Sequence, residues 1–277
     1  MKIDADRREQ RDPDPDPPAV RRQEFCQAYD DLMAGERKQA EVDYPQLLSE
    51  AGSEWLRNKP FRHDPRETAR LLIDFGYVLQ LLELHAGTKL CELGCGSGWM
   101  TRFAARHGVE AEGYDISPAM IEIAREQAAL EHLEVRFEVA DMENVRLGRR
   151  FDACLLYDAL HHSTSPERVF RSAAHALSPG GRLLLAEPNW KQKFQGQTAS
   201  RQFGTTELGY TGHALKRALG KAGFIEITRF HNNRKRLFSN NLRDVLAHVA
   251  EPLAYRLLAL FWTQIWLRAT APQELPR

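Results

Sequence analysis

Leu90-Cys91-Glu92-Leu93-Gly94-Cys95-Gly96-Ser97-Gly98-Trp99 joins an apolar run to the start of an amphipathic segment. Glycine at every second position of the loop allows the backbone to turn sharply from a strand into a helix while a ligand lies against it. Glu92 at the end of the apolar run would repel a pyrophosphate and attract a ligand that carries positive charge and hydroxyl groups. The stretch therefore predicts a strand, a loop and a helix that bind a nucleoside-type cofactor rather than a dinucleotide.

The same alternation of short apolar runs and amphipathic segments continues from Thr88 to about Phe230. We expect strands at Lys89–Leu93, Glu110–Asp115, Glu134–Ala140, Phe151–Tyr157, Gly181–Glu187 and Ile225–Phe230, and helices at Met100–His107, Pro118–Leu130 and Glu167–Leu177. This rhythm indicates right-handed crossovers and an α/β fold with a doubly wound, Rossmann-like, mostly parallel sheet. On such sheets, ligands bind beyond the carboxyl ends of the strands.

The sequence predicts four regions in all, three of which lie outside this core. Residues 1–22, with their Asp-Pro repeats, indicate a disordered tail. Residues 23–87 indicate a helical N-terminal extension or lid, in which Thr68 to Leu84 has the clearest helical pattern. Residues 88–230 form the predicted binding core, and residues 231–277 are expected to be a helical C-terminal extension.

Within the C-terminal extension, Pro252 to Arg268 carries a wide apolar face with tryptophans, preceded by Arg234-Lys235-Arg236. The segment is too short and interrupted to span a bilayer. It either lies on an anionic membrane, covers a lipophilic substrate, or packs on the core or on a partner subunit. Peripheral membrane contact therefore stands beside ordinary packing as an expectation.

Composition limits the classes of function. The chain has 277 residues with 38 basic and 38 acidic side chains, so its formal net charge is +0 and no global field attracts nucleic acid. The four cysteines show no metal-ligand spacing, and we expect no metal site. Reduced thiols and an N-terminus without an apolar signal region predict a cytoplasmic protein. The oligomeric state is not predicted.

Acidic residues stand where the predicted strands end. Glu92 ends the first strand, Asp115 ends the second, and Asp141-Met142 follows the third. A carboxylate after the second strand can accept hydrogen bonds from both hydroxyls of a ribose. Aspartate also favours turns for local reasons, so one such residue means little, whereas several in register indicate a binding edge.

Residues 88–230 resemble a class I S-adenosylmethionine-dependent methyltransferase, in the broad group that includes quinone and small-molecule methyltransferases. The motifs that carry the resemblance are Glu92-Leu93-Gly94-Cys95-Gly96-Ser97-Gly98, Gly113-Tyr114-Asp115-Ile116-Ser117-Pro118-Ala119-Met120, Ala140-Asp141-Met142-Glu143, Phe151-Asp152-Ala153-Cys154-Leu155-Leu156-Tyr157 and Leu177-Ser178-Pro179-Gly180-Gly181-Arg182-Leu183. Each motif is weak alone, and their order over half of the chain is specific.

The resemblance implies S-adenosylmethionine as cofactor and a role for each matching residue. The loop that contains Gly94, Cys95, Gly96 and Gly98 would pass under the methionine and ribose parts of the cofactor, and Asp115 would hold the ribose. The adenine region would be contacted by Ile116 and Met120, and its edge by Asp141 and Met142. The methionine end would be shaped by Glu92 and Tyr157. Such folds usually end in a hairpin that inserts an antiparallel strand, and Gly223-Phe224-Ile225-Glu226-Ile227 occupies its place.

Two other functions compete with this one. An NAD-linked oxidoreductase would need G-x-G-x-x-G, and Trp99 stands where the last glycine should fall. A catalytically inactive cofactor-binding scaffold is the second alternative, because a fold and a cofactor site do not guarantee activity.

Two histidines follow the fourth predicted strand, near the place where the methyl group would project. His161 or His162 could act as a general base, since imidazole is partly neutral near pH 7; alternatively, they line the pocket or bond to backbone. We expect a small or lipophilic organic acceptor, recognised by residues 23–87, 188–212 and 231–277. The sequence does not indicate whether oxygen, nitrogen or carbon is methylated.

Overall fold

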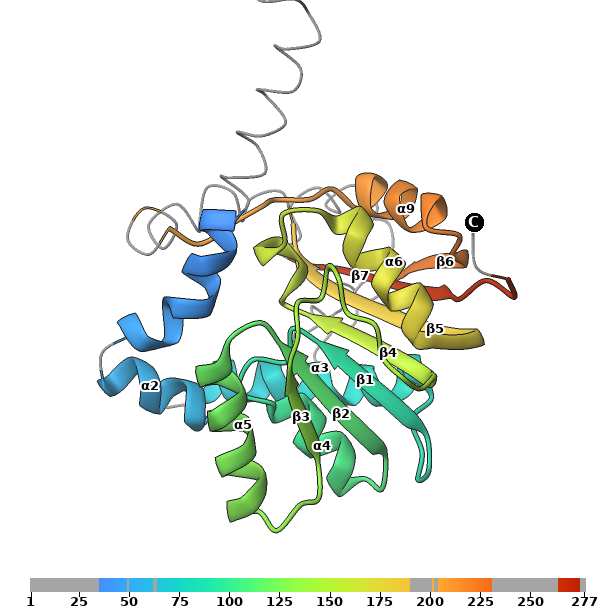
Figure 1. Cartoon of the computed structure of the whole chain (residues 1–277). Coiled ribbons are helices and arrows are strands. Elements are labelled where there is room, and N and C mark those ends of the chain that lie inside the picture. Colours follow the sequence, from blue (N-terminus) through green and yellow to red (C-terminus); the bar gives the residue numbers. More distant parts are fainter. Residues whose placement is uncertain are drawn as a thin grey trace, which may run out of the picture. The chain divides into compact units, whose positions relative to one another are not determined.

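The computed structural model describes residues 35–48, 50–61, 64–189, 201, 204–230 and 264–274. Its centre is a seven-stranded sheet with the order β3-β2-β1-β4-β5-β7-β6 (Figure 1). All described residues from Arg37 onward belong to one compact unit. The strands are β1 Lys89–Leu93, β2 Glu110–Asp115, β3 Arg136–Val139, β4 Phe151–Tyr157, β5 Leu177–Pro188, β6 Ile225–Phe230 and β7 Gln264–Thr270.

The pairing of the strands confirms the predicted fold class. Strand β1 runs parallel to β2 and β4, β2 runs parallel to β3, and β4 runs parallel to β5. Strand β7 alone is antiparallel, both to β5 and to β6. The sheet is therefore mostly parallel, of the α/β Rossmann-like class, with one antiparallel strand near its edge.

The identity of the antiparallel strand corrects the sequence analysis. The segment Gly223-Phe224-Ile225-Glu226-Ile227 was expected to supply it, but β6 lies at the edge of the sheet and β7 is inserted between β5 and β6. The core predicted at 88–230 thus takes a further strand from the C-terminal region.

The helical prediction for the C-terminal region is wrong at residues 264–270, which form β7. Ile265, Leu267 and Ala269 are buried on one side of the sheet and Trp266 is buried on the other. A strand covered on both faces is apolar at nearly every position, so its sequence does not distinguish it from a buried helix. Residues 271–274 are not helical either, and residues 231–263, 275–277 and the tail at 1–22 lie outside the described residues.

The helices begin and end at local signals in the sequence. They are η1 Tyr44–Leu47, α2 Glu50–Arg57, α3 Pro65–Leu82, α4 Trp99–Arg106, α5 Pro118–Leu130, η2 Leu160–His162, α6 Pro166–Ala176 and α9 Gly212–Lys221, and residues 35–43 are also helical. Helix α3 begins earlier than the predicted Thr68 because Asp64 accepts a hydrogen bond from the N–H of Arg66 and a proline follows at the first helical position.

Hydrophobic side chains cover both faces of the sheet. Leu183 and Leu185 of β5 belong to the cluster that contains α6 and α9, whereas Leu184 and Ala186 belong to the cluster that contains α3 and α4. Successive side chains of a strand point to opposite faces, so one strand serves two layers of helices. This is the doubly wound arrangement that the sequence predicts.

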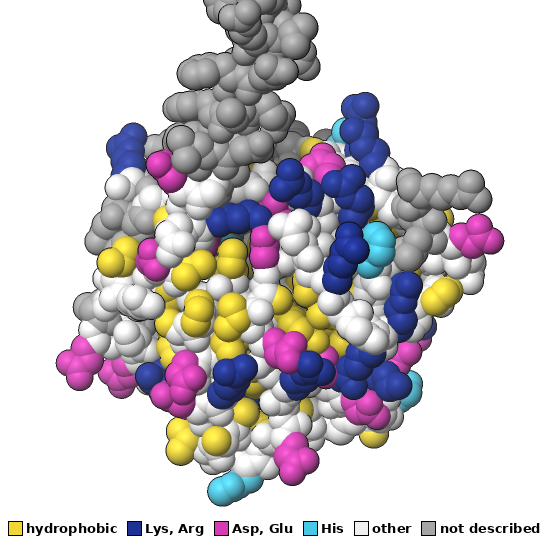
Figure 2. Space-filling model, in the orientation of Figure 1, with side chains coloured by type: hydrophobic (Ala, Val, Ile, Leu, Met, Phe, Trp, Pro, Cys, Tyr) yellow, Lys and Arg dark blue, Asp and Glu magenta, His cyan; other side chains and the backbone are white. Residues whose placement is uncertain are grey.

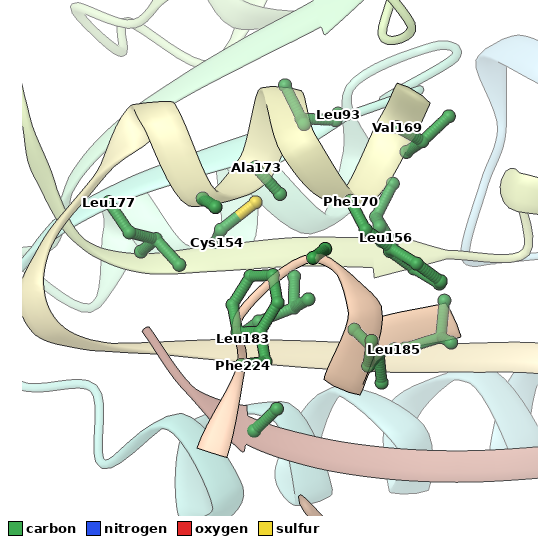
Figure 3. Close-up of a cluster of buried hydrophobic side chains, with 14 of the residues drawn as sticks. Leu93, Cys154, Leu156, Val169, Phe170, Ala173, Leu177, Leu183, Leu185 and Phe224 are labelled. Atoms are coloured by element: carbon green, nitrogen blue, oxygen red, sulfur yellow. The ribbon is translucent and has the colours of Figure 1, made fainter. Parts of the chain in front are cut away.

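Figure 3 shows the first of these clusters at close range. Val169, Phe170 and Ala173 of α6 lie over Cys154 and Leu156 of β4, and all five residues are buried. Helix α6 is therefore anchored directly after η2, the short helix that carries both candidate catalytic histidines.

The surface agrees with the balanced composition. Figure 2 shows basic and acidic side chains interspersed on the face drawn there. Within the part of the chain that the structure describes, every helix is too short or too polar to cross a membrane.

Candidate active site

A cavity of about 290 Å³ lies at the carboxyl ends of β1, β2 and β4. Twelve of the thirteen residues predicted for the site line it, namely Glu92, Gly94, Cys95, Gly96, Asp115, Ile116, Met120, Asp141, Met142, Tyr157, His161 and His162. The thirteenth, Gly98, is described by the structure but is not one of the residues that line the cavity. The topology thus brings together side chains that are spread over seventy positions of the chain.

The glycine loop needs glycine for two different reasons. Gly94 has φ 72°, and a Cβ atom there would lie 2.5 Å from the Cβ of Ala159, so this position allows the loop to pass closely by the end of β4. Gly98 has φ 71°, and its Cβ would lie 2.6 Å from the ring of Phe137. Gly98 therefore permits packing behind the loop rather than contact with a ligand.

Asp115 connects the loop to the second strand. Its Oδ2 accepts a hydrogen bond from the N–H of Gly96 at 2.8 Å, and its Oδ1 accepts one from the N–H of Ser117 at 2.9 Å. Burial raises the pKa of Asp115, and these two N–H groups oppose that rise. A carboxylate has about four acceptor positions, so capacity remains for the hydroxyls of a ligand.

Asp141, after β3, contacts the helical residues 37–43. The Nζ of Lys38 lies 2.5 Å from Oδ2 of Asp141 and 3.3 Å from Oε2 of Glu143. Glu143 in turn accepts hydrogen bonds from the N–H and the hydroxyl of Thr164. The N-terminal helix thus contributes to the wall of the cavity, and the lid expected of residues 23–87 stays a prediction.

Glu92 is a buried carboxyl group in the wall of the cavity, 2% exposed. It accepts a hydrogen bond from the hydroxyl of Thr101. Burial raises its pKa to about 7, although the Thr101 hydrogen bond and the charge of Lys59 act in the opposite direction. Near neutral pH this carboxyl therefore exists in both protonation states, and a cation beside it would favour the charged one.

The end of β4 is held from the side of α3. Tyr157 donates a 2.6 Å hydrogen bond to the fully buried Asp74, and Arg70 lies 3.5 Å from both groups. The next residue, Asp158, has φ 55°, an uncommon backbone conformation for a residue other than glycine. Burial acts to raise the pKa of Asp158, but the nearby charges of His161, Lys59, His162 and Arg70 hold it below its ordinary value.

His161 is buried in the cavity wall next to Glu187, the acid near the end of β5. The Nδ1 of His161 lies 2.9 Å from Oε2 of Glu187, and its Nε2 lies 3.9 Å from Oε2 of Glu207. His161 is 4% exposed and Glu187 is fully buried. The imidazole is thus flanked by two carboxyl groups from two different segments.

His162 has a different environment from its neighbour. Its Nδ1 lies 3.1 Å from the carbonyl oxygen of Thr206 and 3.3 Å from Oε2 of Glu41. Burial lowers the pKa of His162, but the hydrogen bond to Glu41 and the charges of Glu41, Glu207 and Asp158 outweigh this and raise it to about 9. At neutral pH His162 is a cation and a poor proton acceptor.

His161, His162 and Glu207 also offer atoms that lie within 4.8 Å of one another, which is compatible with a metal ion. Histidine and carboxylate side chains form such groups without an ion as well, because an imidazolium attracts carboxylates. The hydrogen bonds described above account for the Nδ1 atom of each ring, and we assign no metal to this group.

The comparisons with known proteins agree with this geometry. Residues 91–185 match a protein family described as a methyltransferase domain. Ubiquinone biosynthesis O-methyltransferase of Coxiella burnetii is 29% identical over 114 residues, which is 41% of this chain and 48% of that protein. The enzyme of the same name from Xanthomonas oryzae pv. oryzae is 30% identical over 115 residues, again 41% and 48%. Residues 91–185 are a class I S-adenosylmethionine-dependent methyltransferase domain.

Solved structures extend the likeness of the methyltransferase fold beyond that domain. An S-adenosylmethionine dependent methyltransferase from Mesorhizobium loti has a TM-score of 0.54 and 23% identity, covering 72% of this chain and 97% of that one. Geranyl diphosphate C-methyltransferase from Streptomyces coelicolor A3(2) has a TM-score of 0.57 and 14% identity, covering 86% and 98%. The curated relatives are matched over only about half of their length, so the likeness establishes the domain and its fold.

Several residues that line the cavity of the methyltransferase domain were not predicted. Lys38, Glu41 and Tyr44 come from the N-terminal helix and η1, and Thr205 and Glu207 come from the segment after β5. The sequence analysis assigned acceptor recognition to these regions without naming residues. Glu187 was predicted only as part of a strand and not as a site residue. Its position near the carboxyl end of β5 is nevertheless the same kind of position that indicated Glu92 and Asp115.

Proposed function

We propose that this chain transfers the methyl group of S-adenosylmethionine to a small organic acceptor. The observation that carries the proposal is the convergence of Glu92, Asp115 and Asp141 with the glycine loop around one cavity. S-adenosylmethionine carries a sulfonium, an ammonium and two ribose hydroxyls, and carboxylates suit all of these groups. When bound, it supplies the methyl group, already activated by the positive sulfur.

The residues present fit this cofactor. Gly94 and Gly96 leave the backbone open toward the cavity, and Asp115 has acceptor capacity for the ribose. Met142 and Ile116 offer apolar surface for the adenine ring, next to Asp141 for its amino group. Glu92 and Tyr157 border the remaining end, where the methionine part would lie. These roles are proposals that rest on the position of each residue in the cavity wall.

The chemistry asked of the protein is modest. Methyl transfer from a sulfonium is an in-line displacement, so the main contribution is to hold the acceptor in line and exclude water. His161 lies in the wall with its Nε2 directed away from Glu187, where a proton leaving the acceptor could be taken up. His162, a cation at neutral pH, would serve binding rather than proton transfer.

We propose a hydroxyl-bearing acceptor of low molecular weight, and the names of the curated relatives support a lipophilic one. The described lining of the cavity is mixed in character, because it includes Trp55 and Tyr44 as well as Glu41 and Glu207. No nucleic-acid partner is proposed, because the charge is balanced.

Calorimetry with S-adenosylmethionine and with NAD tests the proposal. Binding of the former alone is expected, and binding of NAD alone would show an oxidoreductase instead. Formation of S-adenosylhomocysteine with a panel of acceptors then separates an enzyme from an inactive scaffold. Cofactor binding without turnover of any acceptor would favour the scaffold.

Peripheral membrane contact is kept as a proposal only for residues 231–263, whose sequence includes Arg234-Lys235-Arg236 and Trp262. Flotation of the full chain with anionic and neutral liposomes tests this proposal. If the same fraction of protein is recovered in the floating layer with and without liposomes, the proposal is refuted. Truncation after Phe230 is not a usable control, because it would remove β7 from the sheet.

A further inference from the structure

Glu187 stands out among the buried carboxyl groups because three of its four polar contacts are with backbone N–H groups, which can only donate. Its Oε1 accepts hydrogen bonds from the N–H groups of Ala159 at 2.8 Å and Leu160 at 2.7 Å. Its Oε2 accepts from the N–H of His161 at 3.3 Å and lies 2.9 Å from the Nδ1 of the same residue. An ionised carboxylate accepts hydrogen bonds only, and it satisfies all four contacts.

This arrangement determines which nitrogen of His161 carries the proton. Because Oε2 of Glu187 is an acceptor, Nδ1 must be the N–H, and the lone pair of the neutral ring is then on Nε2. The Nε2 atom is 3.9 Å from Oε2 of Glu207, which is too long for a hydrogen bond. Nε2 is therefore the nitrogen of His161 left for a ligand of the cavity.

We propose that Glu187 is a positioning residue that holds His161 with its Nδ1 protonated, so that Nε2 takes the proton of a hydroxyl acceptor during methyl transfer. This inference rests on the proposed function and names the substrate class of the same site, a small molecule methylated on an O–H group. It goes beyond the hydroxyl acceptor and the histidine base already proposed, because it assigns the tautomer of His161 and the residue that imposes it.

The proton and electron balance of the step is complete. The acceptor oxygen forms a bond to the methyl carbon while the carbon–sulfur bond breaks, with its electron pair left on sulfur. The O–H electron pair stays on the oxygen, and the proton passes to Nε2 of His161. The resulting imidazolium is flanked by Glu187 and Glu207, which stabilise its charge until the proton passes to water.

The same geometry favours hydroxyl over amine acceptors. A neutral amine can attack the methyl group with its lone pair and lose its proton afterwards, so a base aligned at the moment of transfer adds little. An alcohol or phenol becomes a good nucleophile only as its proton leaves. A histidine locked into one tautomer at the acceptor end of the cavity is thus of most use to an O–H substrate.

A purely structural role is the competing explanation, in which Glu187 only caps η2. Glu187→Gln separates the two. The amide oxygen of glutamine can still accept from Ala159 and Leu160, but its NH₂ group would face Nδ1 and force the proton of His161 to Nε2. The variant therefore retains the two shorter hydrogen bonds of the cap, loses the one from the N–H of His161, and inverts the tautomer. Glu138→Gln, an exposed carboxyl-to-amide change on β3, is the matched control.

Two readouts test the proposal, and neither of them is cofactor affinity. Nitrogen-15 NMR of the histidine rings, with the His161 signals assigned by their loss in His161→Gln, should show a protonated Nδ1 in the wild type and in Glu138→Gln. The tautomer should be reversed in Glu187→Gln. An unchanged tautomer in Glu187→Gln would overturn the assignment. Shifts of the His161 signals after dialysis against EDTA would show a metal ion on this group, and would also overturn it.

Turnover gives the second readout, with simple phenols and the matching anilines as probes. Phenols are expected to be methylated in preference, at a rate that falls at least about 100-fold in Glu187→Gln and stays unchanged in Glu138→Gln. Preference for anilines, no methylation of any phenol, or a loss below threefold in Glu187→Gln would each overturn the proposal. Failure of the proposed function would differ, since calorimetry would then detect no binding of S-adenosylmethionine.

Discussion

The affinity for S-adenosylmethionine should depend on pH through one buried carboxyl group, Glu92. Its pKa is about 7 in the free protein because it is buried beside the cavity. The ammonium and sulfonium of the cofactor favour the ionised form, so binding below this pKa requires Glu92 to lose a proton first. Affinity should therefore rise with pH across the neutral range.

The magnitude follows from the fraction of ionised Glu92. With a pKa of about 7, roughly one molecule in eleven carries the charge at pH 6 and roughly three in four carry it at pH 7.5. The dissociation constant should fall about eightfold between these two values. The upper limit is kept at pH 7.5 because free α-amino groups begin to lose their proton near pH 8.

Isothermal titration calorimetry of the wild type, Glu92→Gln and Glu138→Gln at both pH values measures this effect. Glu92→Gln retains an acceptor for the hydroxyl of Thr101 but has no titratable group, so its affinity should be lower at pH 7.5 and nearly independent of pH. Glu138→Gln should follow the wild type, since Glu138 is exposed on β3. A flat profile in the wild type, or the same slope in Glu92→Gln, would refute the reasoning.

Three further predictions concern the loop, the ribose site and the second histidine. Asp115→Ala should weaken S-adenosylmethionine binding by roughly 100-fold, since two hydrogen bonds to a charged group are worth about 3 kcal/mol, and normal affinity in calorimetry would contradict its role. Gly98→Ala should lower the free energy of unfolding in urea by about 2–4 kcal/mol, because its Cβ would meet Phe137 at 2.6 Å. Gly96→Ala, with open space at φ 53°, should cost only about 1–2 kcal/mol, and equal losses would count against the packing argument. The pKa of His162, raised from 6.5 to about 9, contributes stability that is full below pH 6.5 and is lost as the pH rises to 9. Because the side chain of His162 is 34% exposed, we expect this contribution to the free energy of unfolding to be about 1–2 kcal/mol. The contribution should be absent in His162→Gln, and parallel pH profiles of unfolding for the wild type and this variant would contradict the prediction.

The sheet from β1 to β5 and the helices between its strands could be predicted because their signals are local. Ser117 and Pro118 mark the start of α5, and Gly108 follows the end of α4, as the sequence indicates. The strand β7 could not be predicted in this way. Its position between β5 and β6 depends on pairing with residues about eighty positions earlier, and its apolar pattern suits a helix equally well.

The sequence by itself determined the class of fold and most of the residues that meet in the cavity. Glycines that turn a strand into a helix, and acids where parallel strands end, keep the same meaning wherever the chain places them. The tertiary structure alone decided the surroundings of the two histidines. Glu187 contacts His161 from 26 positions along the chain, and Glu41 contacts His162 from 121 positions along the chain. Only packing sets those distances, and the charges that meet there decide which histidine is a cation and which nitrogen of the other is left to take a proton.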